Sequence, residues 1–231
     1  LSGDAGLGKS RLADAVLRAI AGPGERPSRR IVWQCAPYHT ATAFHPVAAS
    51  LAPGTLPALA EDDRAALTAL TGRGTLAAAG LTLAQSRHLT LSALGRWVTA
   101  QAPPGGAAVL LVEDAHWIDP STLEALETNL DAWSRARVFV LVTARPGFQN
   151  DFGERASLTR LSLGRLDRAG AAALAAAALG GHRLPSDALD AVMAKAEGVP
   201  LYVEEIAKAF AASGAIVLRD GSWAVSYTHL T

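Results

Sequence analysis

The 231 residues include 21 Lys and Arg against 21 Asp and Glu, so the formal net charge is zero, and 50% of the residues are hydrophobic. A chain of this size and composition can bury one α/β core with a smaller appended unit, which excludes wholesale disorder. Zero net charge argues against a general binder of nucleic acid or acidic membranes, because both need a basic surplus. The single cysteine, Cys35, excludes an internal disulfide and favours a reduced, cytoplasmic protein.

Both ends of the chain are unusual. Leu1 and Ser2 stand directly before a glycine-rich loop, and no initiator methionine precedes them. Since a phosphate-binding loop normally follows a β-strand, we expect these two residues to end a truncated strand in a fragment of a longer polypeptide. Residues 226–231 (SYTHLT) resemble a translated sequencing-adapter tail, and the alternative is that they begin a further element. No secretion signal is visible, and the longest weakly polar run, 169–179, is too short to span a bilayer.

Helix-like and strand-like segments alternate along the first two thirds of the chain. Apolar residues at helical spacing and helix-start signals predict helices over 9–20, 44–51, 61–70, 83–101 and 119–134. Short apolar runs predict buried strands over 30–36, 107–112 and 138–143, and a less regular run predicts one over 158–163. This alternation predicts an α/β fold of the P-loop NTPase class, a doubly wound parallel sheet.

From residue 167 the pattern becomes helical. Helices are predicted over 167–179, 186–197 and 201–212, and a hairpin with its turn at Asp220-Gly221 follows. The predicted domains are therefore a P-loop ATPase core over 1–165, a helical lid over 166–213, and a hairpin or the start of a next element over 214–231.

Residues 3–10 (GDAGLGKS) fit the pattern G-x-x-x-x-G-K-[ST]. Glycines let such a loop curl so that its N–H groups face phosphate oxygens, and the following helix adds its positive end. We expect Lys9 to contact the β- and γ-phosphates of ATP or ADP and the Ser10 hydroxyl to bind Mg²⁺. The predicted nucleotide-binding residues here are Gly3, Asp4, Ala5, Gly6, Leu7, Gly8, Lys9, Ser10 and Arg11.

The buried strand over 107–112 ends in Glu113 and Asp114. In open α/β sheets, ligands bind outside the carboxyl ends of the strands. We therefore expect Glu113 to join the metal shell and Asp114 to orient the attacking water, although the reverse division and a merely solvated acidic pair stay open. Arg145 follows the next strand, and it is either a γ-phosphate contact or an ordinary surface arginine.

Two further groups of polar residues have simpler interpretations. Cys35, His39 and His45 follow no zinc-binding spacing, so we expect a loop that packs near the nucleotide. Glu204 and Glu205 are expected to be a solvated or lid-facing pair.

Four motifs occur in one order: the phosphate loop, 113–119 (EDAHWID), 143–146 (TARP) and 198–201 (GVPL). This order resembles the STAND class of signalling ATPases, relatives of AAA+ proteins, over the chain to about Ser213. The segments 35–39 (CAPYH) and 44–46 (FHP) are similar to the cyclase-associated branch of that class. The family's nucleotide-contacting segment upstream of the first strand has no counterpart here, so adenine contacts from that side are not assigned.

The resemblance implies roles for single residues. Thr143 and Arg145 match the sensor position, and Pro200 matches a lid proline that packs on adenine, with a plain helix start as the alternative. Trp117 and Asp119 match a W-x-D element, and core packing is the alternative for Trp117.

The resemblance also implies a function. An ATP- or ADP-dependent signalling switch would hydrolyse ATP slowly and act on output domains of the same chain, namely a cyclase, repeats or a helix-turn-helix, and nucleotide-dependent oligomers would be expected. The alternatives are a turnover ATPase and a DNA-binding, origin-recognition-like AAA+ ATPase. A turnover enzyme would be a kinase or an ATPase motor, and the sequence shows neither an acceptor-substrate motif nor an arginine finger. The neutral charge and the lack of a recognisable helix-turn-helix argue against the DNA-binding ATPase.

Overall fold

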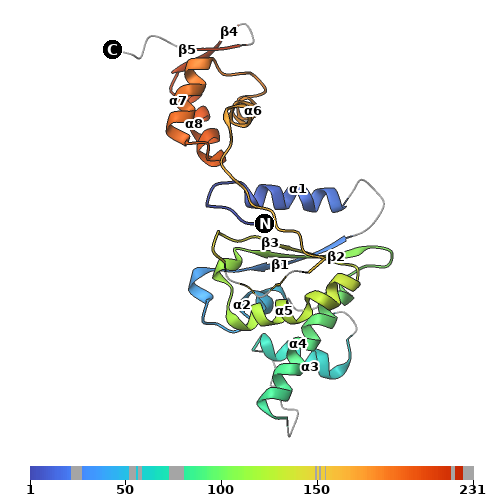
Figure 1. Cartoon of the computed structure of the whole chain (residues 1–231). Helices are drawn as coiled ribbons and strands as arrows, with labels where there is room; N and C mark the ends of the chain where they lie inside the picture. The colour runs from blue at the N-terminus through green and yellow to red at the C-terminus, as the bar shows by residue number, and fades with distance from the viewer. Residues whose placement is uncertain are drawn as a thin grey trace. The chain divides into compact units, whose positions relative to one another are not determined.

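The computed structural model describes residues 1–21, 28–51, 56, 59–72, 81–148, 150, 152–153, 155–219 and 222–225 (Figure 1). The chain divides into two compact units, the first formed by Leu1–Ser2 and Ser10–Leu161 and the second by Gly3–Lys9 and Ser162–Thr231. Each unit has its own cluster of buried apolar side chains. The predicted hairpin turn at 220–221 and the tail 226–231 lie outside the described residues.

A parallel sheet forms the centre of the first unit. Its strands β1 (Ser28–Gln34), β2 (Ala107–Glu113) and β3 (Val138–Val142) lie in the order β1-β2-β3. Residues 108–112 of the central strand are buried, as expected for an apolar run covered on both faces. The register places Gln34 beside Glu113 and Val112 beside Val142, so the carboxyl ends of the strands share one edge. The predicted parallel α/β fold is confirmed.

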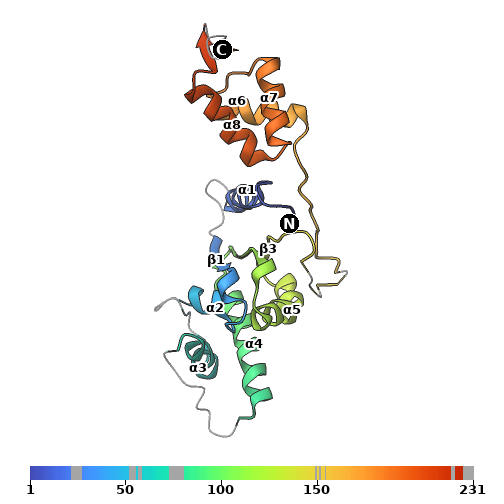
Figure 2. The same cartoon turned by 90° about the vertical axis from the view of Figure 1, so that its left-hand side faces the viewer.

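Helices cover both faces of this sheet. They are α1 (Lys9–Ala21), α2 (His45–Ser50), α3 (Glu61–Leu70), α4 (Leu83–Ala100) and α5 (Pro120–Arg135), with 3₁₀ turns η1 (Pro37–His39) and η2 (Ala115–Trp117). In both views α2 and α5 lie on one side of the sheet and α1 lies on the other (Figures 1 and 2). Trp33 of β1 and Trp133 of α5 meet edge to face, with ring centroids 6.2 Å apart, and both are fully buried.

Helices α4 and α5 approach each other closely at Gly95. The indole nitrogen of Trp133 donates to the Gly95 carbonyl at 3.1 Å, and the Asn129 amide donates to the carbonyls of Leu91 and Ala125 at 3.1 and 2.8 Å. A Cβ on Gly95 would overlap the Asn129 side-chain oxygen. The glycine is therefore required by packing between the two helices.

The first two residues lie beside β3. The Leu1 amine donates to the Val142 carbonyl at 2.8 Å, and Ser2 forms a parallel bridge with Ala144. The Ser2 N–H donates to the carbonyl of Leu161 at 2.8 Å.

The strand predicted over 158–163 is wrong. A turn at 156–157 precedes this stretch, and the Leu158 N–H closes it on the Arg155 carbonyl at 2.9 Å. Residues 158–163 are not part of a strand ladder and contain a single bridge residue, Ser162. A strand needs a hydrogen-bonded partner along its length. Here one backbone bond to another segment is formed, from the Ser2 N–H to the Leu161 carbonyl.

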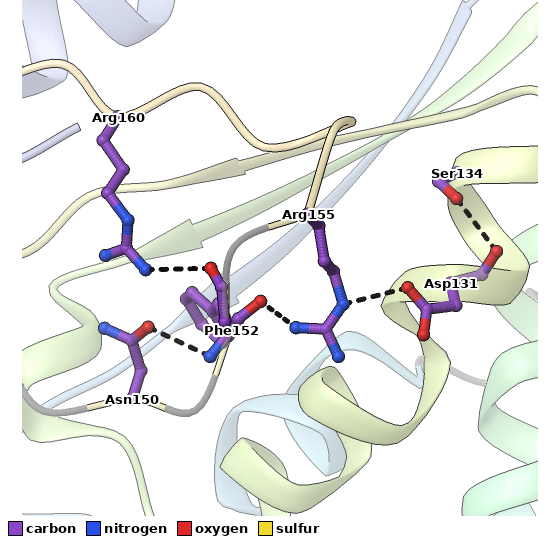
Figure 3. A network of polar contacts seen from close by, with 7 residues as sticks. Asp131, Ser134, Asn150, Phe152, Arg155 and Arg160 are labelled. Carbon is purple, nitrogen blue, oxygen red and sulfur yellow. Dashed lines mark hydrogen bonds and ion pairs between the residues drawn. The ribbon is translucent and has the colours of Figure 1, made fainter.

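The segment between β3 and Leu161 is held to α5 by polar contacts (Figure 3). The Arg155 guanidinium donates to the Asp131 carboxylate at 2.9 Å and also to the carbonyl of Phe152. The Phe152 N–H donates to the Asn150 side chain at 3.3 Å, and Arg160 donates to a carbonyl of the same segment at 3.5 Å. These bonds link the described residues of the irregular connection after β3 to one another and to α5.

The second unit contains α6 (Arg168–Ala178), α7 (Ser186–Ala196), α8 (Pro200–Ala212) and the antiparallel pair β4 (Ile216–Arg219) and β5 (Ser222–Val225). Small buried residues such as Ala171, Ala175 and Ala207 let α6 and α8 pack closely. The helices agree with the predicted segments to within a residue or two. The boundary between the two compact units falls after Leu161. The predicted domain limits after 165 and 213 stay predictions.

In the described part of the chain, no helix combines the length and the apolar character that crossing a membrane requires.

Candidate nucleotide-binding site

The phosphate loop curls around its own lysine. Gly6 and Gly8 adopt φ values of 79° and 90°, which glycine reaches without steric cost. Lys9 begins the 13-residue helix α1, and its ammonium donates to the carbonyls of Gly3 at 2.8 Å and Asp4 at 2.9 Å. The loop therefore presents a cation at the start of a helix, the arrangement that binds phosphate groups.

The same unit brings the start of α8 to this loop. The Leu201 N–H donates to the Gly6 carbonyl at 3.2 Å, and Pro200 occupies the first turn of α8. Upstream, the Leu166 N–H donates to the Gly198 carbonyl at 2.7 Å. Gly198 has a φ of 74°, and a Cβ there would overlap the Leu166 carbonyl, so the G-x-P segment needs this glycine.

In the first unit, Thr143 fixes the backbone behind the acidic pair. Asp114 has a left-handed backbone with φ 53°, and its N–H donates to the Thr143 hydroxyl at 3.1 Å. Thr143 is buried, and its own backbone bonds to Val112 and Ala115 at 2.9 and 2.8 Å. Thr143 thus bonds to the backbone on both sides of Glu113, at Val112 and at Asp114 and Ala115.

Glu113 is half-buried at the end of β2. Burial raises the pKa of this carboxyl group, the nearby Arg30 opposes that shift, and the charges of Asp114 and Asp14 add to it. The pKa of Glu113 is therefore higher than that of an ordinary glutamate.

The buried Asp119 carboxylate accepts hydrogen bonds from two different segments of the first unit. One carboxylate oxygen accepts bonds from the N–H groups of Ser121 at 3.1 Å and Thr122 at 3.0 Å, and the other accepts from the Thr122 hydroxyl at 2.6 Å. The first oxygen also accepts from the N–H of Phe44 at 2.9 Å, 75 residues away. Phe44 has a φ of 55°, so Asp119 both caps α5 and holds the strained start of α2. The aspartate before Pro120 signals the cap, but no sequence pattern signals the contact with Phe44.

Cys35, His39 and His45 do not assemble into a metal site. Burial raises the pKa of the Cys35 thiol to about 12, and Asp119 and Asp114 add to this shift. The rings of His39 and His45 stack 3.5 Å apart at 7°. Over the described residues, no three His, Cys, Asp or Glu side chains gather in a way that could hold a metal ion.

The remaining predicted residues are found at the surface or near it. Arg145 is exposed just beyond the end of β3, and Arg11 is exposed on α1. Trp117 is partly buried against the core of the first unit. Glu204 and Glu205 both pair with Lys208, at 2.8 and 3.4 Å.

The structure thus forms two groups of predicted site residues. The second unit contains the phosphate loop through Lys9 together with Pro200, and the first contains Ser10, Glu113, Asp114, Thr143 and Arg145. Hydroxyl and carboxylate oxygens of the kind that Ser10 and Glu113 carry are the donors that Mg²⁺ prefers.

A parallel α/β sheet with this loop before its first helix defines a P-loop nucleotide-binding protein. Residues 1–142 match the AAA ATPase domain family, and the chain belongs to that family, which binds nucleotide. An uncharacterized protein of Rhizobium meliloti (strain 1021) is 30% identical over 229 residues, a match that covers 89% of this chain. The chain spans only 22% of that relative's length. The family match includes the loop and the acidic pair and ends before Arg145 and Pro200.

Proposed function

We propose that this domain is a regulatory ATPase, a switch that binds ATP or ADP with magnesium, hydrolyses ATP slowly and changes the state of its helical lid. The observation that carries the proposal is the phosphate loop, in which left-handed Gly6 and Gly8 curl the chain around the ammonium of Lys9 at the start of α1. In the proposed complex Lys9 contacts the β- and γ-phosphates, and the N–H groups of residues 3–11 line the phosphate chain.

Each remaining residue has a proposed role that its chemistry supports. Ser10 and Glu113 would hold Mg²⁺, which would supply charge neutralisation at the phosphates when bound. Asp114 would orient the attacking water, and its fixed backbone supports this role, because the Thr143 hydroxyl sets the direction of the strand end. Arg145 would contact the γ-phosphate, and Pro200 would pack on adenine.

The wider setting is proposed from the resemblance to STAND-class regulators. We place the domain within a longer cytoplasmic signalling protein whose output is a cyclase, repeats or a helix-turn-helix, and which assembles in a nucleotide-dependent way. The much greater length of the Rhizobium meliloti relative supports such a multidomain chain. A zero net charge gives no support for direct nucleic-acid binding by this domain.

Calorimetric titration with Mg²⁺-ATP and Mg²⁺-ADP tests the binding step. Lys9→Ala should weaken both nucleotides about 10- to 100-fold, the effect of losing hydrogen bonds from a charged group. Lys195→Ala is the matched control, since this lysine lies over the Phe210 ring, 5.5 Å from its centroid, in the same unit. Equal affinity for the parent and Lys9→Ala would refute the phosphate-loop assignment.

Single-turnover hydrolysis tests the proposed role of Asp114. Asp114→Asn should keep ATP affinity and slow hydrolysis about 100-fold or more, the usual contribution of a group that positions or deprotonates water. Asp62→Asn, an exposed acid in the first turn of α3, is the control. A parental rate in Asp114→Asn would remove Asp114 from the chemistry, and fast multiple turnover by the parent would indicate a turnover ATPase instead of a switch.

A further inference from the structure

Gly6 lies at a position that the phosphate-loop pattern leaves free, yet the structure permits no side chain there without displacement. A Cβ on Gly6 would lie 3.0 Å from the Val199 Cγ1 and 3.4 Å from the Leu201 Cβ. Gly8, with a similar backbone, would meet nothing within 4 Å. The missing side chain at Gly6 therefore serves the approach of the α8 start, within the unit that contains both segments.

A backbone hydrogen bond accompanies this close approach. The Leu201 N–H is in the first turn of α8, where helix N–H groups have no partner within the helix. It donates to the Gly6 carbonyl at 3.2 Å. We call the Gly6 carbonyl, the Leu201 N–H and the Val199 side chain the loop–lid latch.

Peptide geometry links the latch to phosphate binding. The carbonyl of Gly6 and the N–H of Leu7 belong to one planar trans peptide and point in opposite directions. A phosphate that binds the Leu7 N–H therefore fixes the direction of the Gly6 carbonyl, the acceptor for α8. The segment before α8 is held in place by the bond from the Leu166 N–H to the Gly198 carbonyl, at 2.7 Å. A change in the direction of the Gly6 carbonyl therefore acts on the start of α8.

We propose that Gly6 is a positioning residue through which bound nucleotide sets the start of α8, by way of the peptide between Gly6 and Leu7. This inference rests on the proposed nucleotide-binding function. It assigns the coupling step to the latch and not to a contact of the base with the lid.

Amide hydrogen exchange at Leu201 tests the latch without nucleotide. In Gly6→Ala exchange at this amide should become about tenfold faster, because the acceptor is displaced. Val199→Ala in the Gly6→Ala background should restore most of the protection, since it removes the Cγ1 atom that the new Cβ meets. Gly72→Ala controls for backbone strain alone, because its φ is 69° and a Cβ there meets nothing within 4 Å.

Two results would overturn the latch: unchanged exchange in Gly6→Ala, or additive effects of the two substitutions in the double-mutant cycle. Where Gly6→Ala yields no folded protein, Val199→Leu crowds the same contact from α8, leaves the loop sequence intact and should speed exchange likewise.

Addition of Mg²⁺-ADP tests the coupling. In the parent it should slow exchange at Leu201, and in Gly6→Ala this slowing should be lost at saturating nucleotide and recovered with Val199→Ala. ADP that binds the parent without slowing this amide refutes the coupling alone. ADP that does not bind the parent refutes the proposed function, and the coupling with it, whereas the exchange results without nucleotide are independent of that outcome.

Discussion

Removing the carboxylate of Asp119 should destabilise the first unit far more than loss of an ordinary helix cap. Asp119 is 1% exposed, and its oxygens accept bonds from Phe44, Ser121 and Thr122. Loss of the cap costs about 1–2 kcal/mol. The N–H of the partly buried Phe44 and the hydroxyl of the buried Thr122 would each lose a partner, at about 1–3 kcal/mol per group when fully buried. Because such effects are not additive, we expect Asp119→Ala to lower the free energy of unfolding by about 3–5 kcal/mol.

Urea unfolding followed by tryptophan fluorescence measures this loss, since Trp33, Trp97 and Trp133 are all buried in the first unit. Thr82→Ala is the matched control, because Thr82 caps α4 in an exposed position and should cost about 1 kcal/mol. Asp119→Asn keeps an acceptor oxygen and should be much milder than Asp119→Ala. A loss in Asp119→Ala no larger than that in Thr82→Ala would show that the bond to Phe44 contributes nothing.

Three further predictions concern Glu113, Cys35 and Gly95. Because the folded pKa of Glu113 is raised above 4.5, the native state binds more protons than the unfolded state just above that pH, and parental stability should fall as pH rises through this interval. Glu113→Gln should lack this fall. If the free energy of unfolding of both proteins changed with pH in the same way, Glu113 would not have a raised pKa. The Cys35 thiol, with a pKa of about 12, should resist alkylation at pH 8 until urea unfolds the chain; labelling at the rate of a free thiol would oppose its burial. Gly95→Ala should lower the free energy of unfolding in urea by about 1–3 kcal/mol through the clash with Asn129, whereas helix propensity alone predicts about 1 kcal/mol of stabilisation.

Features with a local cause were predictable from the sequence. The apolar run before Glu113 specifies a buried strand by its composition alone, and Pro120 after Asp119 specifies a helix start. The segment 158–163 is apolar at only three of its six positions, Leu158, Leu161 and Leu163. Whether such a segment becomes a strand depends on a neighbouring strand that its own residues do not encode.

Features that depend on distant partners were not predictable. The bond from Phe44 to Asp119 joins residues 75 positions apart, and the raised pKa of Glu113 depends on burial and on the charges of Arg30 and Asp14 nearby. Gly6 shows a subtler limit. Its φ of 79° is by itself a sufficient reason for a glycine, and the sequence shows no sign of the contact with Val199.

For the proposed catalytic role of Asp114, its left-handed backbone determines which substitution is suited to capturing a nucleotide-bound state. Asn and Asp tolerate this conformation because their short polar side chains bond locally, whereas other side chains cost about 1–2 kcal/mol. Asp114→Asn should therefore hold ATP on an undistorted strand end. Asp114→Ala would mix a chemical defect with a conformational one, since relaxation of φ from 53° would also draw the amide away from the Thr143 hydroxyl. A trapped complex prepared with alanine would thus report the geometry of the substitution as much as that of the nucleotide.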